Sequence, residues 1–471
     1  MNEQRMVPPE EIERQKAVAA RLKAAGGGRV WIKTFGCQQN EADSEKLLGI
    51  CELCGYTPTD DPAQADLILI NTCAIREHAE LRALSGAGQL KKLKADKPGL
   101  LIAVCGCMVE QEHRRRQLFT SYPYVDFLFG TDRLHLLPEL LERAGREKKR
   151  FAVTASQPGG DFGVISEGLP VHRASAYRAW LPVMYGCNNF CSYCVVPFVR
   201  GRERSRDTET VLREARGLIE GGCRDITLLG QNVNSYRTGD VDFPELVRRV
   251  ASVSPLLRVR FATSHPKDMS DGLLEVMASM PNVCRAIHLP AQSGATSMLG
   301  RMNRKYTREW YLDRIAAIRR YLPDCAITTD LIAGFSGETE EEHLQTLSLM
   351  REVGYDFAYM FKYSERPGTF AEKHLGDDVP EEVKSRRLSE IIALQNELGH
   401  ASNLRDVGRE FEVLVEGESK RDRNQLSGRT SQNKVVVFDR GYHRVGDYVR
   451  VRITGCTPAT LFGDVISGPC N

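Results

Sequence analysis

Two long stretches of the sequence alternate short apolar runs with helical patterns, and this alternation is the strongest constraint on the fold. In the first stretch, the strand candidates span residues 30–35, 66–70, 100–104 and 125–129, with helical periodicity between them. Such alternation predicts an α/β unit in which helices cover a parallel sheet. Functional groups in sheets of this kind gather at the carboxyl ends of the strands.

The second alternation runs from about residue 180 to about residue 400. Its six strand candidates span residues 180–185, 225–229, 258–262, 285–289, 326–332 and 356–363. Helical patterns, for example at 208–220, 308–321 and 339–353, fall between them. Six strand–helix units predict a partial (β/α)6 barrel whose active face is formed by the carboxyl ends of its strands.

The C-terminal segment has a different period, with short strand candidates at 411–415, 434–438, 448–453 and 461–466. This pattern predicts a small antiparallel β-barrel of the OB type, a fold that often binds oligonucleotides. We therefore divide the α/β chain into an N-terminal domain at 29–147, a linker at 148–175, a barrel at 176–404 and a terminal domain at 405–471. The linker contains a break at 157–161, where proline and glycine interrupt regular structure.

Three cysteines follow the first strand of the predicted barrel with the spacing C-x3-C-x2-C: Cys187, Cys191 and Cys194. Three close thiolates can hold three irons of a 4Fe–4S cube and leave the fourth iron open. An open iron suits the binding and reductive cleavage of S-adenosylmethionine, and hence radical chemistry. Zinc is the alternative, but it usually takes four ligands, and the nearest upstream histidine, His172, falls in the predicted linker.

Cys37, Cys73 and Cys107 follow the first three strands of the N-terminal domain. Because the carboxyl ends of parallel strands lie at one edge of a sheet, these thiols are expected to converge into a second three-thiolate site. The alternative is that they are three buried structural cysteines. Cys105 competes with Cys107 for the third place, but it sits at the strand end itself and is expected to point into the sheet.

Other polar and glycine residues follow the barrel strands and are candidates for contact with S-adenosylmethionine. An aromatic ring between two of the thiolates can pack against the adenine of the cofactor. Glycine turns at helix starts suit the binding of nucleotides, although an ordinary βα turn has the same composition. The candidates are Tyr193, Gly230, Gln231, Asn232, Gln292, Ser293, Gly334 and Gly337. We assign no catalytic side chain beyond the cluster ligands.

Basic residues gather in three places: after the cluster loop, near residue 304 and in the terminal barrel. The candidates for RNA contact are Arg200, Arg202, Arg204, Arg206, Arg304, Lys305, Arg421, Arg423, Arg429 and Lys434. Each group alone has the composition of a solvated face. Together with an OB-type barrel they favour nucleic acid as the partner, with contacts to phosphates rather than to bases.

The 14 cysteines of the 471-residue chain indicate metal or redox use rather than disulfides, because the N-terminus lacks the apolar core of a secretory signal. The longest apolar run, at about 100–109, is half the length of a membrane span. We therefore expect a cytoplasmic protein that does not contact membranes. We also expect a monomer.

Several motifs of this chain resemble those of the methylthiotransferases of the radical S-adenosylmethionine superfamily, and above all the branch that modifies tRNA. The similarity extends from about residue 31 to residue 466. The matching motifs are TFGCQQN (34–40), NTCAIRE (71–77), CGCM (105–108), GCNNFCSYCVVPFVRGRERSR (186–206), TSHPKD (263–268), MNRKYTR (302–308) and GRTSQNKVV (428–436). The last of these resembles the TRAM domain, an RNA-binding barrel.

The resemblance implies two 4Fe–4S clusters: an auxiliary one on Cys37, Cys73 and Cys107, and a radical one on the C-x3-C-x2-C triad. It implies that S-adenosylmethionine serves both as methyl donor and as the source of a 5′-deoxyadenosyl radical. The product is a methylthio group on carbon 2 of the isopentenyl-adenosine just 3′ of the anticodon. The implied partners are the anticodon stem-loop of tRNA and an electron donor such as flavodoxin or ferredoxin.

Three alternatives remain open at this stage. Two belong to the same family, whose members also act on threonylcarbamoyl-adenosine in tRNA or on an aspartate of a ribosomal protein. The third is of a different class, a zinc-structured RNA-binding protein without catalysis.

Overall fold

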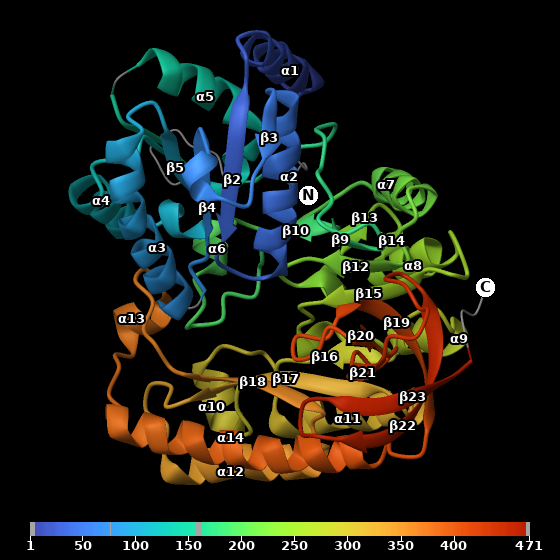
Figure 1. The fold of residues 1–471 in the computed structure, drawn as a ribbon. Coiled ribbons are helices and arrows are strands. Elements are labelled where there is room, and N and C mark those ends of the chain that lie inside the picture. Colours follow the sequence, from blue (N-terminus) through green and yellow to red (C-terminus); the bar gives the residue numbers. More distant parts are fainter. Residues whose placement is uncertain (1–4, 76, 148, 156–162, 468–471) are drawn as a thin grey trace.

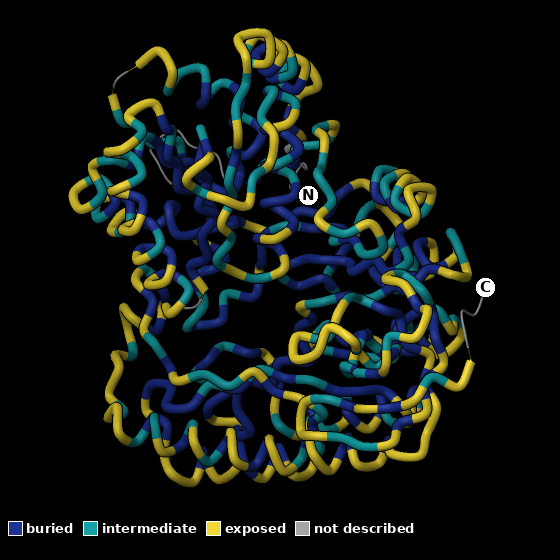
Figure 2. The backbone as a smooth tube through the Cα atoms, viewed as in Figure 1, coloured by how far each residue is buried: buried dark blue, intermediate teal, exposed yellow. Residues whose placement is uncertain are grey.

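The computed structural model describes residues 5–75, 77–147, 149–155 and 163–467. Figure 1 shows three units: an N-terminal α/β unit, a partial barrel and a small C-terminal barrel. Their sheets are buried, whereas the outer helices expose one side to solvent, as Figure 2 shows. The predicted fold class, α/β with a small terminal β-barrel, is confirmed, although one strand pair of that barrel, Val435–Asp439 with Leu461–Ser467, is parallel rather than antiparallel.

The N-terminal sheet has six parallel strands in the order β3-β2-β4-β5-β6-β7. They are β2 (Gly28–Thr34), β3 (Tyr56–Pro58), β4 (Leu67–Thr72), β5 (Leu101–Gly106), β6 (Phe127–Phe129) and β7 (Phe151–Val153). The helices on one face are α1 (Pro9–Ala24), α2 (Gln38–Leu53) and α5 (Leu137–Arg146), and those on the other are α3 (Glu77–Asp96) and α4 (Glu112–Ser121).

The apolar run of β4 illustrates why this sheet is parallel and central. Leu67 and Leu69 pack into the core on one face, and Ile68 and Ile70 pack into the core on the other. A strand that is buried on both faces has no polar alternation, as expected for a parallel sheet between two layers of helices.

The N-terminal unit extends beyond the predicted bounds 29–147 on both sides. Strand β7 lies in the predicted linker 148–175 but adds an edge strand to the sheet beside β6. Helix α1 precedes residue 29 and packs against α5. Farther along the predicted linker, β8 (Val164–Ile165) pairs with β1 (Arg5–Met6). The predicted break at 157–161 lies outside the described residues.

The middle unit contains the six predicted parallel strands in barrel order. They are β9 (Arg178–Pro182), β12 (Asp225–Leu229), β15 (Arg258–Ala262), β16 (Ala286–His288), β17 (Ala326–Ala333) and β18 (Phe357–Lys362). They form two three-stranded sheets, which an isolated bridge between Val259 and Val283 joins. The row of six strands is therefore a partial barrel.

Helices cover the outside of this partial barrel, with α12 and α14 beneath β17 and β18 in Figure 1. They are α7 (Thr208–Glu220), α8 (Phe243–Ala251), α9 (Asp271–Ser279), α10 (Thr296–Arg301), α11 (Arg308–Tyr321), α12 (Glu340–Val353) and α14 (Glu381–Leu404). Short elements complete the chain: η1 (Pro62–Gln64), η2 (Cys107–Glu110), η3 (Thr131–Leu136), β10 (Met184–Tyr185), α6 (Val196–Val199), β11 (Arg204–Ser205), η4 (Val233–Ser235), β13 (Arg237–Thr238), β14 (Val241–Asp242), η5 (Pro266–Asp268) and α13 (Phe370–His374).

The C-terminal unit is a closed five-stranded barrel in the order β19-β20-β21-β23-β22. Its strands are β19 (Glu410–Glu418), β20 (Gln425–Arg429), β21 (Val435–Asp439), β22 (Tyr448–Cys456) and β23 (Leu461–Ser467). Alternating residues of β19, Phe411, Val413 and Val415, fill its core. This alternation, with polar residues outward, is the pattern that predicted a small barrel.

The C-terminal barrel docks at the amino ends of the middle strands. The Arg258 Nη1 donates to the Arg429 carbonyl at 2.6 Å, and the Tyr448 hydroxyl donates to the Arg224 carbonyl at 3.0 Å. Arg224 precedes β12 and Arg258 begins β15. The docking site therefore lies at the opposite end of these strands from the edge where barrel enzymes place their chemistry. In the part of the chain that the structure describes, no helix has the length and hydropathy to cross a membrane.

Candidate functional site

The three N-terminal cysteines lie together at one edge of the first sheet. Cys37 follows β2, Cys73 follows β4 and Cys107 follows β5. Because these strands are neighbours, their carboxyl ends bring the three thiols to the same place. Cys73 and Cys37 both act electrostatically on the thiol of Cys107 and raise its pKa, which shows that the three are close. Cys105 lies in the core beneath, as expected for a residue within the strand.

Two buried asparagines and one glycine hold the loops that carry these cysteines. Asn40 Nδ2 donates to the Thr72 carbonyl at 2.9 Å, and Asn71 Nδ2 donates to the Asn40 carbonyl at 2.9 Å. Gly106 has a φ of 95°, and a Cβ at this position would overlap the carbonyl of Thr72. Only glycine fits a left-handed position so close to the neighbouring strand, which explains the glycine directly before Cys107.

An arginine from the middle unit closes this site. Arg200 Nε lies 3.2 Å from Cys107 Sγ, and Arg200 Nη2 pairs with Asp43 Oδ2 at 2.7 Å. Arg200 is 4% exposed and Asp43 is 6% exposed. Burial raises the pKa of Cys107 to about 12, and the guanidinium of Arg200 works against that rise. The ion pair therefore joins the two units at the first thiol triad.

The second triad, Cys187, Cys191 and Cys194, lies in the loop after β9 and β10. The Cys187 N–H donates to the Gly201 carbonyl at 3.1 Å, and the Cys194 N–H donates to the Cys191 carbonyl at 2.9 Å. Gly186 has a φ of 76°, and a side chain there would overlap the returning backbone. The loop curls back on itself and so brings the three thiols together at the carboxyl edge of the barrel. Burial raises the pKa of the Cys194 thiol, and the nearby Cys191 and Cys187 raise it further.

The segment that follows α10 holds this loop from the other side. The Ser192 N–H donates to the Met302 carbonyl at 3.0 Å, and Asn303 Nδ2 donates to the Phe190 carbonyl at 2.8 Å. Asn303 has a φ of 56°, a left-handed value that asparagine tolerates better than most residues. These bonds fix the cysteine loop against the segment that carries Arg304.

Arg304 is the counterpart of Arg200 at the second triad. Its Nη1 lies 3.3 Å from Cys191 Sγ, its Nη2 donates to the Pro290 carbonyl at 2.8 Å, and the side chain is 4% exposed. Each triad thus has one buried guanidinium within hydrogen-bond reach of one sulfur. Hydrogen bonds and positive charge at cluster sulfurs are known means of tuning a cluster's reduction potential.

The polar cofactor candidates lie along the carboxyl ends of the barrel strands. Gln231 follows β12 and accepts a hydrogen bond from the Gly186 N–H of the cysteine loop. Asn232 Nδ2 donates to Asp268 at 2.8 Å, and its buried Oδ1 has no hydrogen-bond partner among the described residues. Gln292 has a φ of 70° and lies in the loop between β16 and α10. A buried acceptor without a donor fits a polar ligand at this edge.

The remaining cofactor candidates lie near the start of α12, in the cysteine loop, and after β12 and β16. The ring of Tyr193 packs edge-on against Phe335, with centroids 6.1 Å apart. The N–H of Gly334 donates to Glu338 at 2.7 Å, and that of Gly337 donates to Asp378 at 2.7 Å. These two backbone N–H groups therefore already donate to carboxylates of the protein. Gly230 packs against Met184 at the end of β12, and Ser293 is buried beside Thr346.

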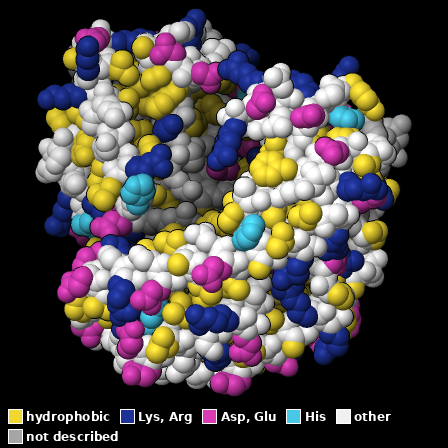
Figure 3. Space-filling view, turned by 60° about the horizontal axis from the view of Figure 1, so that its bottom comes forward, with side chains coloured by type: hydrophobic (Ala, Val, Ile, Leu, Met, Phe, Trp, Pro, Cys, Tyr) yellow, Lys and Arg dark blue, Asp and Glu magenta, His cyan; other side chains and the backbone are white. Residues whose placement is uncertain are grey.

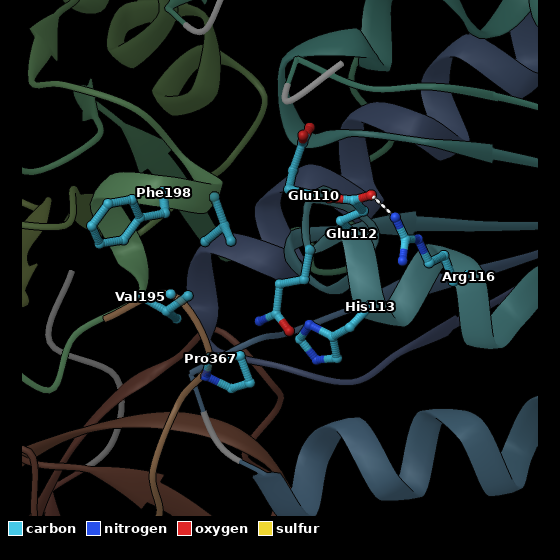
Figure 4. Close-up of a pocket in the computed structure, with 10 residues that line it drawn as sticks. Glu110, Glu112, His113, Arg116, Val195, Phe198 and Pro367 are labelled. Atoms are coloured by element: carbon cyan, nitrogen blue, oxygen red, sulfur yellow. Dashed lines mark hydrogen bonds and ion pairs between the residues drawn. The ribbon is translucent and has the colours of Figure 1, made fainter. Parts of the chain in front are cut away.

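The short helix α6 connects the two triads. Val195 follows Cys194 directly and precedes α6, and Arg200 follows the helix directly. Val195 and Val199 pack against Cys107, so the helix lies between the two sites. A cavity of about 500 Å³ opens beside it (Figure 4). Its lining residues are Glu110, Gln111, Glu112, His113, Arg116, Val195, Phe198, Val199, Pro367 and Gly368.

The donor set of both triads suits an iron–sulfur cluster. Soft thiolates are the preferred ligands of such clusters, which spread three ligands over three separate irons. Burial raises the pKa of Cys187 to about 11, so a positively charged metal would be needed to keep the thiolate form. Within the described residues, no three His, Cys, Asp or Glu side chains are placed to hold a single metal ion.

The structure corrects the interpretation of several basic residues as RNA contacts. Arg200, Arg204, Arg206 and Arg304 are 4–8% exposed, and their guanidinium groups bind carboxylates, carbonyls or sulfur inside the protein. Lys434 is also largely covered and pairs with Asp406 at 2.7 Å. A buried, already paired cation is not available to a phosphate.

The exposed members of the predicted set are Arg202, Lys305, Arg421 and Arg423, with Arg429 partly exposed and bonded to Glu416. Arg202 lies over the ring of Phe190 at 4.2 Å, beside the second triad. Figure 3 shows a hollow on one face of the molecule with Lys and Arg side chains around its rim. We retain the four exposed residues as candidates for RNA contact.

Sequence reasoning missed the residues that support the thiols from a distance. Asn40, Asn71 and Asp43 belong to this group, as does Arg366, which is buried between Glu80 and the Ile75 carbonyl. The one available signal was their position, because the asparagines stand within three residues of a predicted cysteine ligand.

The fold and the thiol site define a radical S-adenosylmethionine protein. The sequence model of the Radical SAM superfamily matches residues 181–350, that of Uncharacterized protein family UPF0004 matches residues 29–130, and that of the TRAM domain matches residues 404–466. Membership of this superfamily implies a 4Fe–4S cluster and S-adenosylmethionine. A radical S-adenosylmethionine methyltransferase, TsrM from Kitasatospora setae, has a similar fold: the TM-score is 0.53 at 14% identity over 75% of this chain and 79% of that chain.

Three relatives illustrate how close the similarity is. The tRNA-2-methylthio-N(6)-dimethylallyladenosine synthase of Bacteroides thetaiotaomicron is 52% identical over 93% of this chain and 96% of its own. The proteins of that name from Porphyromonas gingivalis strain W83 and Chlorobium phaeobacteroides are 49% and 48% identical, over 94% and 92% of this chain and 96% of their own. The chain belongs to the family of tRNA-2-methylthio-N(6)-dimethylallyladenosine synthases.

The family assignment confirms two predictions, the membership of the methylthiotransferases and the status of an enzyme. The zinc-structured RNA-binding protein is not supported. The names of the relatives given above favour the dimethylallyl substrate over the threonylcarbamoyl and ribosomal-protein alternatives.

Proposed function

We propose that this protein adds a methylthio group to carbon 2 of the dimethylallyl-adenosine beside the anticodon of tRNA. The observation that carries this proposal is the arrangement of two thiol triads from separate units at the two ends of one short helix. A substrate base placed beside α6 is in reach of both triads. The relatives' name supplies the substrate, and the TRAM match supports tRNA as the partner.

The roles of the cysteines follow from this arrangement. Cys187, Cys191 and Cys194 would hold a 4Fe–4S cluster with one open iron, which supplies reductive cleavage of bound S-adenosylmethionine to a carbon radical. Cys37, Cys73 and Cys107 would hold a second 4Fe–4S cluster. Carbon 2 of adenine carries an aromatic C–H that acid–base side chains do not remove, so radical chemistry is required.

The other residues of the site position these groups and exclude water. Arg304 donates to Cys191 and Arg200 donates to Cys107, so each guanidinium fixes one sulfur in a dry environment. Tyr193 lies between Cys191 and Cys194 in the sequence, and we assign its ring to stacking on the adenine of the cofactor. Gln231 and Asn232 offer amides at the same edge for the polar groups of the cofactor, and we assign Gln292 and Ser293 to the same task.

Recognition of the RNA falls to the exposed cations and the C-terminal barrel. Arg202 lies over Phe190 of the cysteine loop and Lys305 follows Arg304, whereas Arg421 and Arg423 lie between β19 and β20 of the C-terminal barrel. An anticodon stem-loop that binds both regions presents one unstacked base to the site, the usual mode of sequence-specific RNA recognition. Phosphate contacts by these arginines set the orientation of the stem.

We further propose that a small one-electron carrier such as flavodoxin or ferredoxin reduces the second triad's cluster, since ferredoxins reach potentials near −400 mV. We propose a monomer that acts in the reducing cytoplasm, where its tRNA substrate is found. Pull-down of carrier proteins tests the proposed electron donor, and sedimentation analysis tests whether the protein is a monomer.

The decisive experiment for the proposed function uses purified, anaerobically reconstituted enzyme. It is incubated with S-adenosylmethionine, a reductant and an anticodon stem-loop that contains dimethylallyl-adenosine, and the nucleosides are then analysed by mass spectrometry. We expect a product heavier by one methylthio group in place of one hydrogen. The Cys107→Ala variant is the matched control, because it retains the second triad and hence cleavage of the cofactor.

A stem-loop with threonylcarbamoyl-adenosine tests the nearest alternative in parallel. If that nucleoside alone is methylthiolated, the substrate assignment is wrong although the family assignment stands. If neither RNA is modified and a ribosomal protein gains the group instead, the role of tRNA as partner is also wrong.

A further inference from the structure

The cavity beside α6 has one apolar wall. Val195, Phe198 and Val199 contribute it from α6 and the residue before, and Pro367 closes it from the loop between β18 and α13 (Figure 4). Phe198 is 45% exposed, so its ring is accessible to a ligand in the cavity. An exposed aromatic at the edge of a cavity of about 500 Å³ is typical of a site that binds a partly apolar ligand.

The opposite wall of the cavity comes from the N-terminal unit and carries an unsatisfied acceptor. Gln111 is 8% exposed, and its Nε2 donates to Glu80 Oε1 at 3.2 Å. This bond fixes the orientation of the amide, because Nε2 must face the carboxylate. Gln111 Oε1 then has no hydrogen-bond partner among the described residues. A buried acceptor of this kind fits a ligand that brings an N–H.

The cavity does not suit a negatively charged ligand. Arg116 already pairs with Glu112, with Nη2 and Oε1 2.5 Å apart. Burial and the nearby charge of Arg114 lower the pKa of His113, so its ring is neutral at pH 7. Within the described lining of the cavity, a carboxylate on a ligand therefore meets no unpaired cation, whereas Glu110 and Glu112 are acidic.

The chemistry of the substrate places its N6 substituent next to the reacting carbon. Carbons 2 and 6 of adenine flank the same ring nitrogen, so a group on N6 projects from the edge of the base that carries carbon 2. When carbon 2 lies beside α6, within reach of both triads, the N6 substituent must occupy space that adjoins the same helix. The cavity described above is such a space.

We propose that this cavity binds the dimethylallyl group on N6 of the substrate adenosine, with the apolar wall of Val195, Phe198 and Val199 against the five carbons. Gln111 Oε1 accepts the hydrogen bond of the single N6–H. The inference rests on the proposed function and adds to it the residues that set substrate choice. It also explains why a threonylcarbamoyl group, which carries a carboxylate, is a poor occupant.

The test compares two anticodon stem-loops that differ only in the dimethylallyl group, one prenylated and one with unmodified adenosine. Rates of methylthio transfer give kcat/KM for each RNA, and 5′-deoxyadenosine formation without RNA reports on the second triad. The Phe198→Ala variant should lose at least about tenfold in its preference for the prenylated RNA, since contacts of this size change selectivity by roughly 10–200-fold. Gln111→Met should lose roughly three- to tenfold on both RNAs equally, because both carry an N6–H.

Phe357→Ala is the matched control. Phe357 is 44% exposed and packs edge-on against Tyr359, as Phe198 packs against Phe190, but it lies on β18 away from the cavity. We expect its preference for the prenylated RNA to equal that of the parent enzyme.

The outcomes separate the two levels of the proposal. If the parent enzyme modifies the prenylated RNA but Phe198→Ala keeps its preference, the cavity does not hold the dimethylallyl group and this inference is overturned. A rise in the KM for S-adenosylmethionine in Phe198→Ala, with unchanged RNA preference, would assign the cavity to the cofactor and also overturn it. If the parent enzyme modifies neither RNA, the proposed function itself fails.

Discussion

Replacement of Arg200 by methionine tests whether the buried ion pair with Asp43 holds the two thiol sites in one assembly. The side chains of Arg200 and Asp43 are 5% and 8% exposed, and the paired atoms are 2.7 Å apart. Methionine keeps much of the volume of arginine but removes its charge. The substitution therefore leaves Asp43 buried without its cation and leaves Cys107 without its guanidinium neighbour.

The magnitude follows from the burial of the pair. Removal of one partner of a buried ion pair typically destabilises a protein by about 3–5 kcal/mol, mostly because the remaining charge is uncompensated. In a domain of roughly 150–250 residues, each kcal/mol lost from the free energy of unfolding lowers the melting temperature by roughly 2–4 °C. The melting temperature of Arg200→Met should therefore fall by roughly 6–20 °C. A variant in which Asp43 is also replaced, Arg200→Met with Asp43→Leu, should recover most of this loss, since no buried charge is left.

The assay is thermal unfolding followed by circular dichroism, with iron content as a second measurement. Arg202→Met is the matched control, because Arg202 is an exposed arginine two residues away that lies over Phe190. We expect the control to unfold within about 0.5 kcal/mol of the parent, as most surface substitutions do. If Arg200→Met also melts within that range, or if the double variant is less stable than the single one, the pair does not link the units as argued.

Three further predictions concern the clusters, the pH dependence and the RNA. Cys107→Ala should bind about four irons fewer per chain than the parent, one cube, and still form 5′-deoxyadenosine; equal iron in the two proteins would rule out Cys107 as a ligand. Burial tends to raise the pKa of Glu214, but the guanidinium of Arg206 outweighs burial, so the pKa in the folded state is lowered from 4.5. The ionised carboxylate therefore stabilises the fold fully above pH 4.5, and this stabilisation is lost as the pH falls through the lowered folded-state pKa. Glu214→Gln should therefore lower the melting temperature at pH 7 and have a smaller effect at pH 3, and an effect that grows on acidification would contradict this sign. Replacement of Arg421 and Arg423 by alanine should weaken tRNA binding and reduce the slope of log affinity against log salt by roughly one per arginine, measured by filter binding; an unchanged slope would show that these residues do not contact phosphates.

The arrangement of the thiols could be predicted from the sequence because it depends on local pattern and on one general rule. Each of Cys37, Cys73 and Cys107 comes within three residues of the end of a largely apolar run, and the carboxyl ends of parallel strands share one edge. The strand at 258–262 was also predicted at its observed position, where Val259 and Phe261 alternate with arginines. Strand β7 carries no such signal, because three residues at a sheet edge are too few for a period, and only the pairing with β6 makes them a strand.

The roles of the arginines could not be predicted, because they depend on partners far away in the sequence. Arg200, Arg204 and Arg206 alternate with other residues in a short basic run, which is also the composition of a phosphate-binding surface. In the structure, Arg200 pairs with Asp43, 157 residues away, and Arg204 pairs with Asp132, 72 residues away. A sequence shows the cations but not which carboxylates the fold brings to them.

The same contacts explain why one chain carries both thiol sites. Arg200 belongs to the middle unit but donates to Cys107 of the N-terminal unit, and only five residues lie between it and Cys194 of the second triad. The four helical residues of α6 span roughly 6 Å, so the spacing between Cys194 and Arg200 is set mainly by a short, rigid piece of backbone. Relative motion of the two units would break a buried ion pair before it separated the triads. A reaction that needs a radical on one side of a base and a sulfur donor on the other requires such a fixed separation, because a misplacement of about 1 Å already costs about a hundredfold in rate.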